Sequence, residues 1–93
     1  MSEHHNIHLA QPEIVKRLKR AEGHLRTIIA MLEEQRPCLD VAQQLHAVEK
    51  AVSAAKKVLI HDHIDHCLEQ VVGASSGEGR SAIDEFKEIT KYL

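Results

Sequence analysis

Apolar residues along the chain recur at alternating spacings of three and four, which is the pattern of an amphipathic α-helix. The first such stripe consists of Leu18, Ala21, Leu25, Ile28 and Leu32. Pro12 suits the first turn of a helix, and Pro37 disfavours helical backbone in the residue before it. We therefore predict a first helix that begins near Gln11 and ends at or just before Arg36.

A longer stripe follows Pro37, and no glycine or proline interrupts it before Gly73. Its members are Cys38, Val41, Leu45, Val48, Val52, Ala55 and Leu59. Pro37 can open this helix, because the first helical position needs no backbone N–H. The pattern predicts a second helix over about residues 37–72, roughly 50 Å long at ~1.5 Å per residue.

The end of the chain predicts a linker and a short third helix. Residues 73–79 are rich in glycine and serine, which is typical of a flexible linker. Ser81 and Asp84 then resemble a capping box, with aspartate in the place of glutamate. The third helix would bear a stripe made of Ile83, Phe86, Ile89 and Leu93. At the other end, residues 1–10 are polar and histidine-rich, so we predict a flexible arm there and one domain over residues 11–93.

The composition supports an all-α fold. Hydrophobic residues make up 43% of the 93 residues but aromatic ones only 2%, so leucine, isoleucine, valine and alanine must form the core. Such a core suits helices packed on helices. A helix of roughly 50 Å cannot be enclosed by so small a monomer, so its surplus apolar stripe must pack on other subunits. We predict a protomer of two long helices and one short one that forms a homodimer or a higher oligomer.

Several classes of protein are excluded by the same reading. No apolar run approaches the ~20 residues of a membrane span, and the N-terminus lacks the features of a signal peptide. We therefore expect a cytoplasmic protein with no membrane partner. Cys38 and Cys67 are then better read as thiols or metal ligands than as a disulfide. No glycine-rich or strand–turn–helix site accompanies them, so neither an enzyme nor a small-molecule substrate is expected.

Two cysteines and one histidine have spacings that favour a metal site. His63 and Cys67 lie four positions apart and share one helix face. Cys38 lies 25 residues before His63, which is about 37 Å along a continuous helix at ~1.5 Å per residue. It can meet the other two from an antiparallel second subunit, with the twofold axis near the small residues around 51–52. Two thiolates and an imidazole suit Cu(I), Ni(II), Co(II) or Zn(II), although a single cysteine on an apolar face is often plain core.

Basic residues are concentrated in the first part of the chain. Residues 1–57 contain nine Lys or Arg and seven Asp or Glu, whereas residues 58–93 contain three and seven. The candidate DNA-binding residues are Lys16, Arg17, Lys19, Arg20, Lys56 and Lys57. Repeated by symmetry, such a surface could contact phosphate backbones. Charge alone equally fits a solvated helix face, and no helix-turn-helix or zinc-finger spacing is present.

Several runs of the sequence together resemble the CsoR/RcnR/FrmR family. They are RLKRAEGHLR at residues 17–26, MLE at 31–33, CLDV at 38–41 and VLIHDHIDHC at 58–67. The resemblance covers roughly residues 12–93, and the Cys, His, Cys pattern is its most specific part. It implies a bacterial repressor built as an antiparallel four-helix-bundle dimer that assembles into a disc-shaped tetramer. It also implies operator DNA binding that is lost when an inducer occupies an inter-subunit site.

The resemblance is strongest to the copper-sensing branch of that family. It implies that Cys38 of one subunit binds Cu(I) in a trigonal site with His63 and Cys67 of its partner. It also implies that Glu85 supports His63 from behind. Pro37 stands where this branch has a tyrosine, which departs from the pattern.

The resemblance also bears on DNA. Arg17 matches a basic position that contacts DNA in the family. A second such arginine falls at Ala54 in this chain, so that Lys50, Lys56 or Lys57 would have to replace it.

Other inducers stay open. The Ni(II)/Co(II) branch adds an N-terminal histidine ligand, and its position falls at Asn6, between His5 and His8. The persulfide-sensing branch has the two cysteines but lacks the histidine, and the formaldehyde branch has a proline where Ser2 stands. A metal buffer would need the same ligands without a DNA-binding surface. Copper is the first hypothesis among these.

Overall fold

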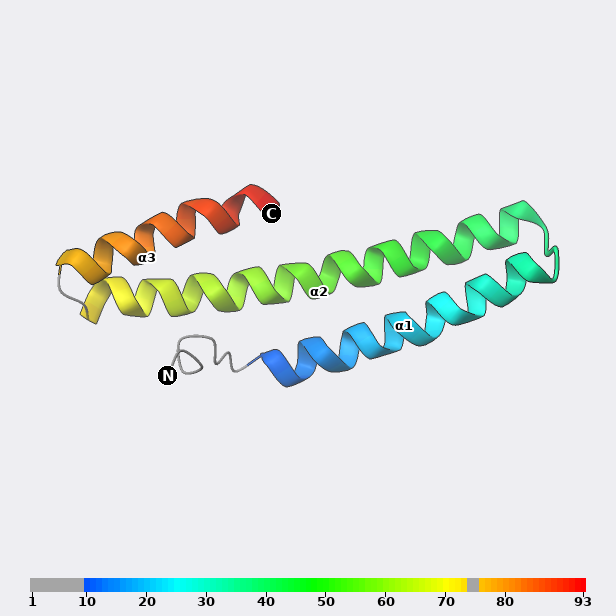
Figure 1. The fold of residues 1–93 in the computed structure, drawn as a ribbon, viewed down its shortest axis with the longest axis horizontal. Coiled ribbons are helices and arrows are strands. Elements are labelled where there is room, and N and C mark those ends of the chain that lie inside the picture. The colour runs from blue at the N-terminus through cyan, green and yellow to red at the C-terminus, as the bar shows by residue number, and fades with distance from the viewer. Residues whose placement is uncertain (1–9, 74–75) are drawn as a thin grey trace. The chain divides into compact units, whose positions relative to one another are not determined.

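The computed structural model describes residues 10–73 and 76–93, except for the side chains of Cys67 and of residues 70–79. The described residues form α1 (Gln11–Glu33), α2 (Cys38–Gly73), α3 (Ser76–Ile89) and a short 3-10 helix, η2 (Thr90–Tyr92) (Figure 1). The predicted all-α fold with two long helices and one short helix is confirmed. Among these helices, none is long and apolar enough to cross a membrane.

A tight turn ends α1. Gln35 takes up a left-handed backbone conformation with φ 59°. Its N–H donates to the carbonyl of Leu32 at 3.0 Å, and the N–H of Arg36 donates to the carbonyl of Met31 at 2.9 Å. These two hydrogen bonds form a Schellman-type C-cap, which satisfies carbonyl groups that the helix end would otherwise leave unpaired. Pro37 then leads directly into α2, close to the boundary predicted from the sequence.

The chain divides into two compact units, which α2 passes through. We call Pro12–Lys56 the hairpin unit and Lys57–Leu93 the C-terminal unit. In the hairpin unit, α1 and the first part of α2 run antiparallel and side by side (Figure 1). In the C-terminal unit, the last part of α2 is followed by α3 and η2.

The core of the hairpin unit consists of residues that recur every seven positions. The buried residues of the two rows are Ile14, Ala21 and Ile28 on α1, and Val41, Val48 and Ala55 on α2. Ile28 and Met31 form one cluster with Val41 and Val48. A repeat of seven keeps the apolar seams of two antiparallel helices facing each other. Full burial of a side chain such as Ile28, which is 2% exposed, contributes about 1.5–3 kcal/mol.

The predicted stripes contain a second row on each helix that this core does not cover. Leu18, Leu25 and Leu32 on α1 are 42–58% exposed, and Leu45, Val52 and Leu59 on α2 are 41–46% exposed. A pattern of three and four is wider than one helix–helix seam, so one neighbouring helix buries only part of it. The surplus apolar surface expected from the sequence is therefore present on both helices.

The predicted start of the third helix is wrong. α3 begins at Ser76, so Ser81 lies inside the helix and does not cap it, and the linker is shorter than residues 73–79. Glycine lowers helix propensity by about 1 kcal/mol per residue, but tertiary packing overrides propensity. Ala82 is the buried residue of α3, while Ile83 and Phe86 of the predicted stripe are exposed.

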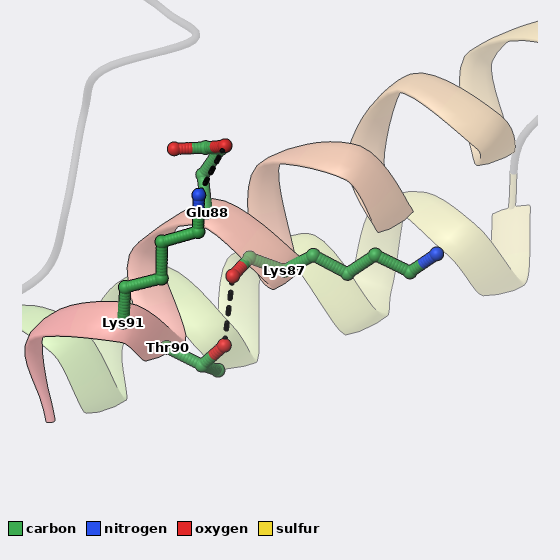
Figure 2. A network of polar contacts seen from close by, with 4 residues as sticks. All are labelled: Lys87, Glu88, Thr90 and Lys91. Atoms are coloured by element: carbon green, nitrogen blue, oxygen red, sulfur yellow. Dashed lines mark hydrogen bonds and ion pairs between the residues drawn. The ribbon is translucent and has the colours of Figure 1, made fainter.

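The C-terminal end of the chain is held by local polar contacts. The Thr90 hydroxyl donates to the carbonyl of Lys87 at 2.9 Å, and Lys91 Nζ lies 3.0 Å from Glu88 Oε2 (Figure 2). Both contacts are exposed, so each contributes little to stability. They accompany the change from α3 to η2.

Candidate metal centre

Two side chains of the predicted site face each other in the C-terminal unit. His63 belongs to α2 and Glu85 to α3, and His63 Nε2 lies 3.1 Å from Glu85 Oε1. The His63 side chain is 18% exposed, whereas that of Glu85 is 60% exposed. A carboxylate that accepts a ring N–H fixes the orientation and tautomer of the ring and makes the other nitrogen a better ligand. The contact thus has the form of a metal-binding histidine with its supporting carboxylate.

Three other predicted ligands fall partly or wholly outside the described residues. Cys67 belongs to α2, one helical turn after His63, but its side chain lies outside the description. His5 and His8 also lie outside the described residues. Their roles stay predictions.

Cys38 stands apart from His63 in the single chain. It is the first residue of α2 and is exposed. Because α2 is continuous, the 25 residues between them correspond to about 37 Å at ~1.5 Å per residue. Over residues 10–73 and 76–93, no three His, Cys, Asp or Glu side chains gather closely enough to hold a metal ion. One chain alone therefore does not assemble the predicted ligand set.

The position of Cys38 on α2 is informative. It occupies the same sevenfold row as Leu45, Val52 and Leu59, and all four side chains are exposed. A helix that covered this apolar row would also cover the thiol. Thiolate sulfur and neutral imidazole are ligands that suit Cu(I), and they also bind Ni(II), Co(II) and Zn(II). The donors present fit a soft or borderline ion, provided that a second chain brings them together.

The predicted DNA-binding residues are mostly accessible. Lys16, Lys19 and Arg20 are exposed on α1, and Lys56 and Lys57 are exposed on α2. Arg17 differs, because it is only partly exposed and its Nε lies 3.1 Å from Glu13 Oε2. Four of the five residues at 16–20 are basic, so this turn of α1 is a concentrated source of positive charge.

Sequence reasoning missed the partner of His24. The Nε2–H of His24 donates to Gln44 Oε1 at 2.6 Å and so joins α1 to α2 within the hairpin unit. His24 lies three positions after the buried Ala21, and Gln44 lies three positions after the buried Val41. Both are thus at the second position of a heptad seam. Two polar residues at matching seam positions are the signal that could have predicted the contact.

Comparison with known proteins gives one family and several relatives. The family model described as "Metal-sensitive transcriptional repressor" matches residues 10–92. The copper-sensing transcriptional repressor CsoR of Mycobacterium ulcerans is 41% identical over 84% of this chain, and CsoR of Bacillus subtilis is 37% identical over 94% of it. Among solved structures, the nickel-responsive transcriptional regulator InrS is similar with a TM-score of 0.79 and 30% identity, covering 94% of this chain and 97% of that one.

The relatives differ in length from this chain. The match spans 65% of the Mycobacterium ulcerans protein, which is less than two thirds of its length. It spans 88% of the Bacillus subtilis protein. The helical part that carries the candidate ligands is shared, whereas the mycobacterial relative extends beyond it.

Proposed function

The chain belongs to the family of metal-sensitive transcriptional repressors, and from that membership we propose that it binds operator DNA without metal and releases it when Cu(I) binds between two subunits. The observation that carries the proposal is the contact of His63 with Glu85 at 3.1 Å. It holds an imidazole as a metal ligand would be held. Copper is the first choice because relatives at 37–41% identity are copper-sensing repressors.

A second copy of the chain would complete the site. The exposed apolar rows on α1 and α2 are surfaces of the kind that pack on another helix. An antiparallel partner with the twofold axis near residues 51–52 covers the row on α2 and brings its Cys38 to His63 and Cys67. The result is a four-helix-bundle dimer, and two such dimers form the proposed tetramer.

The proposed ligands come from two subunits. Cys38 of one subunit joins His63 and Cys67 of the other, and two thiolates with an imidazole suit a soft monovalent ion. Glu85 engages Nε2 of His63, so Nδ1 is the ring nitrogen that would bind the ion. When these side chains bind it together, they tie α2 of one subunit to α2 of its partner. The basic segments of α1 then change their spacing, and metal and DNA weaken each other's binding by the same factor.

The DNA-binding surface consists of the basic residues on both long helices. Lys16, Arg17, Lys19 and Arg20 on α1 supply most of it, together with Lys56 and Lys57 on α2. Their charges would contact phosphate oxygens and replace condensed counterions, so operator affinity should fall steeply with salt concentration. The proposal includes no catalytic step, and it assigns the protein to the cytoplasm, where the operator is.

A nickel sensor is the second candidate. The similarity to a nickel-responsive regulator favours it. Ni(II) and Co(II) take more ligands than Cu(I), and His5 or His8 would supply an additional one. Zn(II) would fit the same donors in a tetrahedral site. Thiolate charge-transfer and ligand-field bands in the visible spectrum report Ni(II) or Co(II), whereas the filled d shells of Cu(I) and Zn(II) give none.

The test is an anaerobic titration with two readouts. Operator affinity is measured by fluorescence anisotropy on a duplex that the metal-free protein has selected from a random pool, with and without one equivalent of each ion. We expect Cu(I) to weaken binding and Cys38→Ala to remove the effect. His46→Ala is the control, because His46 lies on the surface 3.7 Å from Glu49. Unchanged affinity with Cu(I) would contradict the copper proposal, and loss of binding with Ni(II) alone would support the second candidate.

Charge reversal separates a repressor from a metal buffer. Replacing Lys16, Lys19 and Arg20 by glutamate removes three cations and adds three anions on exposed positions of α1. We expect operator binding to fall by at least about a thousandfold, because several phosphate contacts are lost. Cu(I) binding should be unchanged. Wild-type protein that binds metal but selects no duplex from the pool would be a buffer.

A further inference from the structure

Two ion pairs on α1 have the same spacing but different environments. Glu13 precedes Arg17 by four residues, and Glu22 precedes Arg26 by four residues, which is the favoured order of charges on a helix. Arg17 Nε lies 3.1 Å from Glu13 Oε2, with the arginine side chain 41% exposed. Arg26 Nη1 lies 3.9 Å from Glu22 Oε2, with the arginine side chain 71% exposed. Only the first pair is close and partly covered.

The atom of Arg17 that meets Glu13 is its Nε. That nitrogen is buried and, within the described part of the chain, makes no hydrogen bond, so the contact is an ion pair without a directed hydrogen bond. A guanidinium group carries five N–H donors in a planar fork, and four of them belong to the two Nη groups. A carboxylate near Nε therefore leaves those two groups for a planar, two-oxygen acceptor such as a phosphate.

We propose that Glu13 is a positioning residue, which holds the Arg17 guanidinium in the orientation that contacts a DNA phosphate. The inference rests on the proposed operator binding and deepens it. An unrestrained arginine loses much rotamer freedom when it binds. A guanidinium that is already held by its own helix loses less, so a fixed contact to phosphate forms more readily.

Simple electrostatics predicts the opposite sign for a change at this position. Glu13 is an anion on a surface that faces polyanionic DNA, and its removal should strengthen binding through charge alone. If Glu13 positions Arg17, its removal weakens binding although the net charge becomes more favourable. The sign of the change thus separates the two roles.

The experiment is a double-mutant cycle on the full chain without metal. The variants are Glu13→Gln, Arg17→Gln and the two combined, with Glu22→Gln as the matched control on the same helix. The probe is a fluorescein-labelled duplex that the wild-type protein has selected from a random pool, and affinity is measured over a range of salt concentrations. Circular dichroism melts check that each variant is folded.

We expect Glu13→Gln to weaken binding several-fold and to reduce the salt slope by about 0.9, the value for one lost phosphate contact on duplex DNA. In the Arg17→Gln background the same change should have no further effect, because the group it positions is gone. Glu22→Gln should leave affinity unchanged or raise it slightly.

Two results would overturn the inference while operator binding by the wild type still stands. One is Glu13→Gln protein that binds more tightly than wild type. The other is an effect of the same size with and without Arg17. If the wild type itself selects no duplex, the proposed function fails, and that outcome is distinct from both.

Discussion

Two histidines each join a pair of helices, one in each unit, and their partners differ in charge. In the hairpin unit, His24 donates to the amide oxygen of Gln44 at 2.6 Å. In the C-terminal unit, His63 lies 3.1 Å from the carboxylate of Glu85. An amide satisfies a ring N–H without adding charge, whereas a carboxylate also raises the basicity of the ring. The same residue type therefore serves as a structural link in one unit and as a prepared ligand in the other.

The surroundings of the two contacts strengthen this distinction. The His24 contact lies in a seam with seven buried apolar residues, from Ile14 to Ala55. Among the described side chains of the C-terminal unit, only Ile60 and Ala82 are buried. Stability in proteins is unevenly distributed, and elements that respond to ligands come from the less stable part. The hairpin unit thus has the properties of a scaffold, and the C-terminal unit those of a responsive part.

The largest expected difference between the two histidines concerns coupling between metal and DNA. In wild-type protein the ratio of operator affinities without and with Cu(I) should lie in the usual allosteric range, about 5–150-fold. His63→Ala should reduce this ratio to about one, because the imidazole that joins the site to Glu85 is lost. His24→Ala should leave the ratio unchanged. Anisotropy titrations measure both, and equal losses in the two variants would end the distinction.

Removing only the charge of the partner is the next test. Glu85→Gln keeps the shape of the side chain and should lower metal affinity about tenfold, near the lower end for supporting carboxylates because Glu85 is exposed. Competition with a chromophoric Cu(I) chelator measures it. Glu88→Gln is the matched control, since Glu88 pairs with Lys91 on the same helix. Comparable losses in both variants would show that general charge, and not the contact to His63, is responsible.

His24 should matter for folding in proportion to the hydrogen bond it makes. His24→Ala leaves the amide of Gln44 without its partner in a partly buried seam, which should lower the free energy of unfolding by about 1 kcal/mol. Urea unfolding followed by circular dichroism gives the value. The double variant with Gln44→Leu should recover part of the loss, because no unpaired amide remains. Unchanged stability in His24→Ala would mean that the contact is not structural.

The smallest effect is expected at the turn of the hairpin. Gln35 holds a left-handed backbone conformation that glycine adopts without steric cost. Gln35→Gly should therefore raise the free energy of unfolding by about 0.5 kcal/mol, after the greater freedom of glycine in the unfolded chain is subtracted. Gln35→Ala, which keeps the Cβ, should not. Metal affinity should be the same in all three proteins if the hairpin unit is only a scaffold.

The sequence predicted the helices well and their burial only in part. Proline and the absence of breakers set the ends of α1 and α2 to within a few residues, because these signals act locally. The spacing of three and four could not tell Ile28 from Leu25, since both lie on the apolar side of α1. Which of them is covered depends on where the second helix lies. The start of α3 was missed because glycine was weighed by propensity, without the packing that follows it.

The candidate site divides in the same way. Glu85 came from a family resemblance, and the structure brings it to His63 through the packing of α3 in the C-terminal unit. The meeting of Cys38 with His63 stays a prediction, because it needs a second chain. Gln44 and Glu13 were missed because a polar residue shows its partner only when two positions on a helix or on two helices are compared. The spacing of four between Glu13 and Arg17 was visible in the sequence but is common on any charged helix.

The uninterrupted course of α2 affects how this chain can change by insertion and deletion. One residue added between Val52 and His63 would rotate everything beyond it by about 100° and advance it by about 1.5 Å. Cys38 and the row that follows it would then no longer share a face with the residues beyond the insertion. The turn at residues 34–36 and the end of η2 interrupt no helix that joins two ligands. Variation in length is therefore expected at those places, while α2 changes by substitution alone.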